Sequence, residues 1–207
     1  MEKITSRTNP LMTHIRKLSS SAAYRREQGE FLCDSPKLLA EALLWKAPIL
    51  TVVATSGHQL PPLGGDVRVV EVPEDVMASV SPMKTPQGVL FTCRLPRTQL
   101  PDTLEGRCYM VLDGVQDPGN VGTIWRTADA FGCDGLVLLP GCADPYSPKT
   151  VRSSMRGVPQ QRVDGRCRGT ERGAHRQRDP ALRRGSARRY AGRKKRGLYP
   201  RCAGHRQ

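Results

Sequence analysis

The composition of the sequence changes abruptly after Met155, and this break limits which part of the chain can fold. Residues 1–155 hold 16 Lys and Arg against 16 Asp and Glu, whereas residues 156–207 hold 17 against 3. The whole formal net charge of +14 therefore lies in the last 52 residues. Of these, 15 are Arg and 8 are Gly, and only 6 are Val, Leu or Tyr. Such a segment cannot bury enough apolar surface to offset the entropy of ordering, so we expect a disordered basic tail.

Residues 1–96 alternate between strand and helix patterns in the manner of a small α/β domain. Short β-branched or alternating runs predict four strands, with the sequences FLC, PILTVVAT, DVRVVEV and GVLFTCRL. Ser35-Pro36 predicts the start of a helix that continues to Trp45, and PEDVMASVSP predicts a second, brief helix. A basic segment, residues 13–20, also has a helical pattern. The order strand, helix, strand, strand, helix, strand favours an α/β fold.

A second α/β unit, residues 107–155, follows a polar linker at 97–106. CYMVLD predicts a buried strand, and GLVLL predicts the next one. Between them, five apolar residues share one helical face, and Gly132 suits the helix C-cap; the five are Val121, Ile124, Trp125, Ala128 and Phe131. We therefore expect a βαβ crossover, right-handed by default, and then a loop and helix in CADPYSPKTVRSSM.

The turn that joins the first strand of this unit to its helix has features of a ligand-binding loop. Ligands of open α/β sheets bind beyond the carboxyl ends of the strands, where residues 113–120 lie. Gly114 and Gly119 would let the backbone approach a ligand, and Asn120 would cap the helix while presenting its amide. Arg126 would supply a fixed cation for a phosphate. Common helix capping and an ordinary surface arginine are the alternative explanation, and without a GxGxxG pattern or Walker lysine a nucleoside triphosphate is disfavoured.

The stretch LDGVQDPGNVGTIWRTADAFGCDGLVLL closely resembles the first signature of the SpoU (TrmH-like) family of RNA ribose 2′-O-methyltransferases, which belong to the knotted SPOUT class. The segments ITSRTNPLMTHIRKL, YRREQGEFLCDSPKLLAEAL and TPQGVL resemble the family's substrate-binding domain. The resemblance spans about residues 3–155. It implies an L30e-like substrate-binding domain at 1–96, followed by an incomplete trefoil-knot α/β methyltransferase domain. Ser35 departs from the pattern, because relatives usually have Gly at this position.

The resemblance implies transfer of a methyl group from S-adenosylmethionine to a ribose 2′-hydroxyl of ribosomal or transfer RNA by a homodimer. It assigns the key role to Arg126, with Asn120 shaping the site. Since a guanidinium is effectively always protonated, we expect Arg126 to hold an RNA phosphate and stabilise the developing alkoxide rather than act as a base. Four basic residues of the front domain could contact the RNA backbone, although a solvated helix face explains them equally: Arg16, Lys17, Arg25 and Arg26.

The remaining composition favours a cytoplasmic protein that holds no metal. The N-terminus lacks the apolar core of a signal peptide, and no apolar run approaches the ~18 residues of a membrane span. The seven cysteines include no CxxC pair and no histidine at ligand spacing, which argues against structural zinc and favours reduced thiols.

The sequence leaves the family pattern in the basic tail. Two further family signatures, a Gly-Ser-Glu-Gly stretch and an apolar-Pro segment leading to Ser-Leu-Asn, do not occur in these 207 residues. We expect them to form the knot and the cofactor pocket, so the chain is predicted to be incomplete and inactive. The alternative function is a non-catalytic RNA-binding protein that uses the front domain and an arginine-rich tail.

A shift of reading frame would explain the tail. Codons exist for residues 156–160 that read Gly-Ala-Phe-Arg when shifted by one base, which is how relatives continue after SPKTVRSSM. Residues 204–207 can likewise be encoded so that the shifted frame reads Val-Ile-Gly, the start of the second signature. We therefore favour a frameshifted and truncated C-terminus over a genuine RNA-binding tail.

Overall fold

The front domain is built on a five-stranded mixed sheet with the strand order β1-β4-β3-β5-β2. The computed structural model describes residues 2–96 and 108–155, together with the backbone of 162–165. Strands β1, β4 and β3 are parallel, and β5 runs antiparallel to both β3 and β2. The strands are β1 (Glu2–Lys3), β2 (Glu30–Asp34), β3 (Ile49–Thr55), β4 (Arg68–Val72) and β5 (Val89–Arg94).

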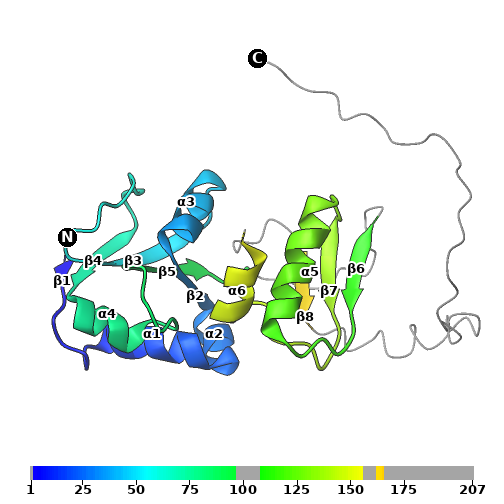
Figure 1. The fold of residues 1–207 in the computed structure, drawn as a ribbon, viewed down its shortest axis with the longest axis horizontal. Coiled ribbons are helices and arrows are strands. Elements are labelled where there is room, and N and C mark those ends of the chain that lie inside the picture. The colour runs from blue at the N-terminus through cyan, green and yellow to red at the C-terminus, as the bar shows by residue number, and fades with distance from the viewer. Residues whose placement is uncertain (1, 97–107, 156–161, 166–207) are drawn as a thin grey trace, which may run out of the picture. The chain divides into compact units, whose positions relative to one another are not determined.

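Four helices of the front domain lie on the two faces of this sheet, with α3 on the opposite side from α1 and α4 (Figure 1). They are α1 (Pro10–Ser20), α2 (Ala22–Gln28), α3 (Pro36–Leu44) and α4 (Glu74–Val80). The predicted order from β2 to β5 is confirmed. Helix α1 begins three residues earlier than residue 13, because Asn9 caps it by accepting the Leu11 N–H at 2.9 Å and Pro10 is preorganised for the first turn.

Successive side chains along the strands point to opposite faces of the sheet, and they form two apolar layers in the front domain. Val53 and Leu90 belong to the cluster that includes α1 and α4, whereas Val52 and Phe91 belong to the cluster that includes α3. The second cluster also contains Trp125 and other buried residues of the second domain. One continuous core therefore joins the two sets of elements.

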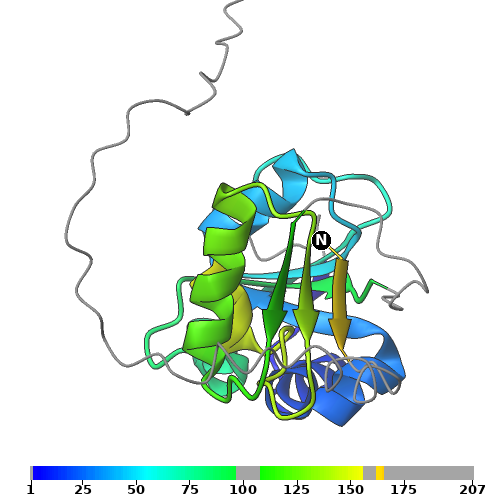
Figure 2. The same ribbon diagram turned by 90° about the vertical axis from the view of Figure 1, so that its right-hand side faces the viewer.

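The second domain contains a parallel sheet in the order β6-β7-β8, and α5 lies on one of its faces (Figure 2). Its elements are β6 (Tyr109–Leu112), α5 (Pro118–Ala130), β7 (Gly135–Leu138), α6 (Pro148–Ser154) and β8 (Arg162–Gly165). The predicted strand–helix–strand unit is thus confirmed. The prediction that β6 is buried was wrong, because Met110 and Val111 are exposed, and Phe131 lies exposed just beyond α5 rather than on its buried face. Gly132 follows the end of α5 with a φ of 68°, in the left-handed conformation expected at a helix C-terminus.

Strand β8 differs from the expectation of disorder throughout 156–207. Its backbone pairs with β7 in parallel, with Leu136 opposite Val163. A short strand is held by backbone hydrogen bonds to its neighbour, so the arginine-rich composition did not indicate it. The rest of the tail, residues 156–161 and 166–207, lies outside the described residues, as do residues 97–107, which include the predicted linker at 97–106. Within the described part, none of the helices is long and apolar enough to cross a membrane.

Candidate functional site

Two loops form one hydrogen-bonded unit at the carboxyl edge of the parallel sheet. Residues 113–117 follow β6, and residues 139–147 follow β7. The Leu139 N–H donates to Leu112 O at 2.8 Å, and the Ala143 N–H donates to Val115 O at 2.8 Å. Gly114 has a φ of 63°, a conformation that a side chain would disfavour. The loop predicted to bind a ligand therefore lies at the sheet edge where α/β proteins bind ligands.

Asp117, rather than Asn120, caps helix α5. Its Oδ1 accepts the Asn120 N–H at 2.9 Å, and its Oδ2 accepts a hydrogen bond from Lys149 Nζ at 2.8 Å. The prediction that Asn120 caps the helix was wrong, because Pro118 occupies the first helical position and Asp is a strong capping residue. The hydrogen bond from Lys149, followed by that from Asn120, lowers the pKa of Asp117.

Asn120 and Arg126 are both exposed on α5. They are six residues apart, so they lie about 9 Å apart along the helix axis. Arg126 Nη1 is 2.9 Å from the sulfur of Met155, which is a weak acceptor. Among the residues that the structure describes, no carboxylate lies within ion-pair distance of Arg126. Its positive charge therefore remains available to an anion.

Gly122 allows α5 to pack closely against α6. A Cβ atom at Gly122 would lie 2.4 Å from Thr150 O and 2.6 Å from the Cβ of Ser153. Only glycine fits this contact without displacement of backbone. The contact holds α6 where Lys149 reaches Asp117. The sequence did not indicate the role of Gly122, because this residue lies inside a regular helical pattern.

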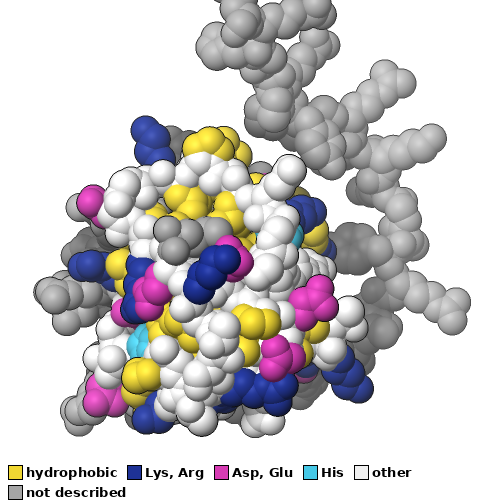
Figure 3. Space-filling model, turned by 90° about the vertical axis from the view of Figure 1, so that its left-hand side faces the viewer, with side chains coloured by type: hydrophobic (Ala, Val, Ile, Leu, Met, Phe, Trp, Pro, Cys, Tyr) yellow, Lys and Arg dark blue, Asp and Glu magenta, His cyan; other side chains and the backbone are white. Residues whose placement is uncertain are grey.

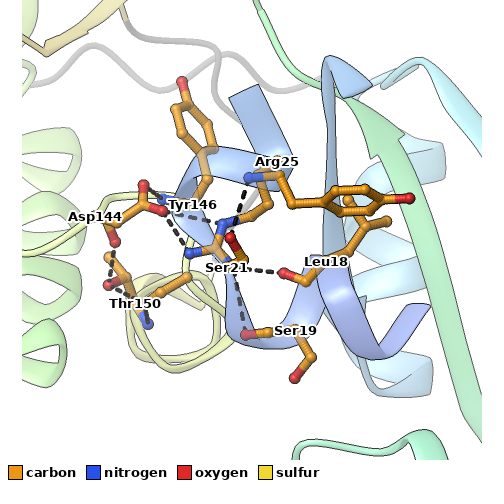
Figure 4. Close-up of polar contacts among 9 residues, drawn as sticks. Leu18, Ser19, Ser21, Arg25, Asp144, Tyr146 and Thr150 are labelled. Atoms are coloured by element: carbon orange, nitrogen blue, oxygen red, sulfur yellow. Dashed lines mark hydrogen bonds and ion pairs between the residues drawn. The ribbon is translucent and has the colours of Figure 1, made fainter. Parts of the chain in front are cut away.

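Arg25, one of the four residues expected to contact RNA, is buried at 4% exposure (Figure 4). Its Nη2 and Nε donate to Asp144 Oδ2 at 2.6 and 3.0 Å. Its Nη1 donates to Leu18 O at 2.5 Å and to Ser19 O at 3.3 Å. With its donors directed at these acceptors, Arg25 has little surface to offer a phosphate, so we do not retain it as an RNA contact.

The other three basic residues differ in how accessible they are. Lys17 and Arg26 are exposed, and Lys17 Nζ lies 5.3 Å from the ring centroid of Tyr24. Arg16 is half-buried and donates to Ser79 O at 3.3 Å and to the carbonyl of Arg7. On the face of the molecule shown in Figure 3, basic and acidic side chains are interspersed rather than segregated. Lys17 and Arg26 are therefore better placed than Arg16 to contact RNA.

A second charged pair joins β2 to α6. Asp34 is buried at 2% exposure, and its Oδ1 accepts Arg152 Nε at 3.2 Å. Arg152 Nη2 also donates to Oδ2. Burial raises the pKa of Asp34, and the hydrogen bond from Arg152 opposes this only in part. No local pattern could indicate this pair or the Arg25–Asp144 pair, because each joins residues more than 110 positions apart.

The fold and the site define an α/β domain with a loop at the carboxyl edge of a parallel sheet and an exposed arginine on the helix that follows this loop. Comparison with known proteins identifies the class more closely. A family model described as the SpoU rRNA Methylase family matches residues 107–164. A second model, the MRM3-like substrate binding domain, matches residues 9–90. The two matches cover the second and the front domain separately.

Individual proteins agree with these models. The 23S rRNA (guanosine(2553)-2'-O)-methyltransferase RlmP of Bacillus subtilis (strain 168) is 32% identical over 155 residues, which cover 74% of this chain and 61% of that protein. A crystal structure of an rRNA methyltransferase from Sinorhizobium meliloti has a TM-score of 0.69 and 32% identity, covering 85% of this chain and 69% of that one. A structure of the S. meliloti enzyme described as AdoMet bound has a TM-score of 0.65 and 34% identity, covering 78% and 63%.

The chain belongs to the SpoU rRNA methylase family. The resemblance inferred from residues 112–139 is thereby confirmed. The chain spans 61% and 62% of the length of two curated relatives that it matches.

Proposed function

We propose that the described residues form the RNA-binding domain and the arginine-bearing part of the catalytic domain of an S-adenosylmethionine-dependent RNA ribose 2′-O-methyltransferase. Family membership supports the reaction class, and it disfavours a purely RNA-binding origin for these two domains. The observation that carries the proposal is Arg126, exposed on the helix that follows the candidate site loop and without a carboxylate partner among the described residues. The L30e-like ancestry of the front domain and the trefoil knot are parts of this proposal.

Arg126 binds the RNA phosphate next to the target ribose. A guanidinium presents several donors in a fixed plane and stays charged, so it can orient a phosphate and stabilise negative charge on the 2′-oxygen as the proton leaves. Its partner in the structure, the Met155 sulfur, competes weakly with a phosphate because a thioether is a poor acceptor. Asn120, in the first turn of α5, shapes the wall of the site beside the loop.

S-adenosylmethionine supplies the methyl group in this reaction, but the residues that the structure describes do not complete a site for it. Both carboxylate oxygens of Asp117 are already hydrogen-bonded within the chain, to Asn120 and Lys149. The sequence also lacks the two signatures expected to form the cofactor pocket. We therefore propose that the 207-residue chain by itself retains RNA without methylating it.

RNA binding by the front domain rests on Lys17 and Arg26, which contact backbone phosphates. Such contacts release counterions, so the affinity falls steeply as the salt concentration rises and depends little on sequence. The substrate is ribosomal or transfer RNA, in line with the names of the relatives. The intact enzyme acts as a cytoplasmic homodimer.

The role of Arg126 is tested in a chain whose reading frame is shifted by one base after Met155, as the frameshift hypothesis requires. Transfer of labelled methyl to RNA should fall by about 10²–10³ in Arg126→Ala, the usual effect of removing a group that stabilises an oxyanion. Arg94→Ala is the control: Arg94 is also an exposed arginine, at the end of β5, and its replacement should leave methyl transfer unchanged. Full activity in Arg126→Ala would refute the assignment, and retention of RNA without any label would favour the non-catalytic alternative.

A further inference from the structure

Two thiols lie in contact at the base of the second domain, at the end of the sheet opposite to the candidate site. The sulfur atoms of Cys108 and Cys133 are 3.5 Å apart. Cys108 is exposed at the start of β6, whereas Cys133 is buried at 5% exposure just after α5. The backbone fixes this arrangement, because the Asp134 N–H donates to Cys108 O at 2.7 Å. The Cys108 N–H donates in turn to Asp134 Oδ2 at 2.9 Å.

We propose that Cys108 and Cys133 are a modification site that a peroxide converts reversibly into an intramolecular disulfide. A disulfide bond is about 2.05 Å long, so the sulfur atoms need to approach each other by about 1.5 Å. In the first step the Cys108 sulfur attacks the peroxide oxygen, which breaks the O–O bond and gives a sulfenic acid and water. In the second step the Cys133 thiol attacks the Cys108 sulfur, forming the S–S bond and releasing a second water.

The two cysteines differ in the way that this order of events requires. Peroxide can reach the exposed Cys108 thiol, whereas Cys133 is covered. The hydrogen bond with Cys108, and after it burial, raises the pKa of Cys133. Cys133 therefore stays protonated and reacts second. Any dithiol reductant reverses the bond by thiol–disulfide exchange.

The disulfide would close a loop that contains β6, the candidate site loop and α5. Asn120 and Arg126 lie inside this loop. A cross-link between segments that are already in place stabilises the folded state by restricting the unfolded chain. We expect the oxidised protein to unfold at a temperature about 5 °C higher than the reduced protein.

A second pair of cysteines provides a control within the same molecule. Cys33 and Cys93 interact through their side chains on the neighbouring strands β2 and β5. Both are buried, at 1% and 0% exposure. Because both of these thiols are buried whereas Cys108 is exposed, peroxide should link Cys108 to Cys133 and leave Cys33 and Cys93 reduced.

The test is peptide mapping of the 207-residue chain after brief treatment with hydrogen peroxide and alkylation of the remaining thiols. We expect a cross-linked peptide joining Cys108 to Cys133, about 2 Da lighter than the two reduced peptides and restored by dithiothreitol. Cys108→Ser should abolish this cross-linked peptide. Cys142→Ser is the control and should leave it unchanged, since the Cys142 thiol is half-buried and donates to Leu112 O. Free Cys108 and Cys133, a sulfinic acid at Cys108 without a cross-link, or a link from Cys108 to another cysteine would each overturn the proposal.

Discussion

Ser35 combines a favourable side-chain contact with an unfavourable backbone conformation. Its hydroxyl caps α3 by accepting the Leu38 N–H at 3.2 Å. Its φ of 134° and ψ of 150°, however, lie in a region that is occupied almost only by glycine. The resemblance to the family led us to expect Gly at this position, and the backbone gives a physical reason for Gly. The departure seen in the sequence is therefore a site of local strain.

Replacing Ser35 with Gly should stabilise the protein. Relief of strain is worth about 1–3 kcal/mol, and loss of the cap to Gly costs only a few tenths of a kcal/mol, so we expect a net gain of about 1 kcal/mol in the free energy of unfolding. Urea denaturation measures this change. Ser21→Gly is the matched control, since Ser21 caps α2 at the same 3.2 Å with a φ of −118°. Equal destabilisation by both changes would contradict the strain at Ser35.

The carboxyl of Asp117 should titrate below its ordinary pKa of 3.8. A depressed pKa means that the contribution of this group to stability is present above the unfolded-state pKa and is lost as the pH falls through the folded-state value. NMR titration of the carboxyl carbon checks this, and Lys149→Met should move the pKa upward because Lys149 is the main cause of the shift. Lys37→Met is the control and should leave the titration curve of Asp117 unchanged. An unchanged curve in Lys149→Met as well would refute the coupling between Lys149 and Asp117.

At the scale of helices and strands, periodicity and capping chemistry predicted most of the fold. The elements from β2 to α6 follow from local signals: β-branched runs predict the strands, and Ser-Pro and Gly mark the ends of helices. The sequence did not predict the details that depend on a choice between two suitable residues or on a partner that is distant in the sequence. Asp117 and Asn120 both suit a cap, and only the structure shows which one is used. Strand β8 depends on its pairing with β7, which the composition of residues 162–165 does not reveal.

The contact between α5 and α6 should be sensitive to a single methyl group. Gly122→Ala would place a Cβ within 2.4 Å of the Thr150 carbonyl oxygen, and the backbone must move to admit it. We expect a loss of about 2 kcal/mol in the free energy of unfolding, typical of overpacking in a close contact. Thermal or urea denaturation measures the loss. Gly64→Ala, where a Cβ meets no atom within 4 Å, should be close to neutral, and an equally neutral Gly122→Ala would contradict the packing.

At the scale of the whole molecule, the two domains are joined by an apolar core and by two charged pairs of opposite polarity. The front domain contributes Arg25 to one pair and Asp34 to the other, and the second domain contributes Asp144 and Arg152. The sequence predicted two α/β units with a linker between them. It could not predict how they pack, because complementarity between distant surfaces leaves no periodic signal.

Asp144→Asn should weaken the whole described fold rather than one loop. The change keeps the shape of the side chain but leaves the guanidinium of Arg25 buried without a counterion, at a cost of about 3 kcal/mol. Unfolding followed by circular dichroism and by the fluorescence of Trp45 and Trp125 should report the same loss. Asp66→Asn, on an exposed turn, is the control and should change stability little. Similar stability of the two variants would show that the Arg25–Asp144 pair does not support the fold.

The central claim, that this is the RNA-binding and arginine-bearing part of a ribose 2′-O-methyltransferase, is tested most directly by where a labelled methyl group goes. RNA is incubated with labelled S-adenosylmethionine and the chain read in the shifted frame after Met155, called the restored chain, and is then hydrolysed with alkali. A 2′-O-methylated ribose cannot attack its own phosphate, so we predict that the label remains in dinucleotides, whereas the 207-residue chain gives RNA retention without label. Label in mononucleotides, no label from the restored chain, or label transferred by the 207-residue chain would contradict the account.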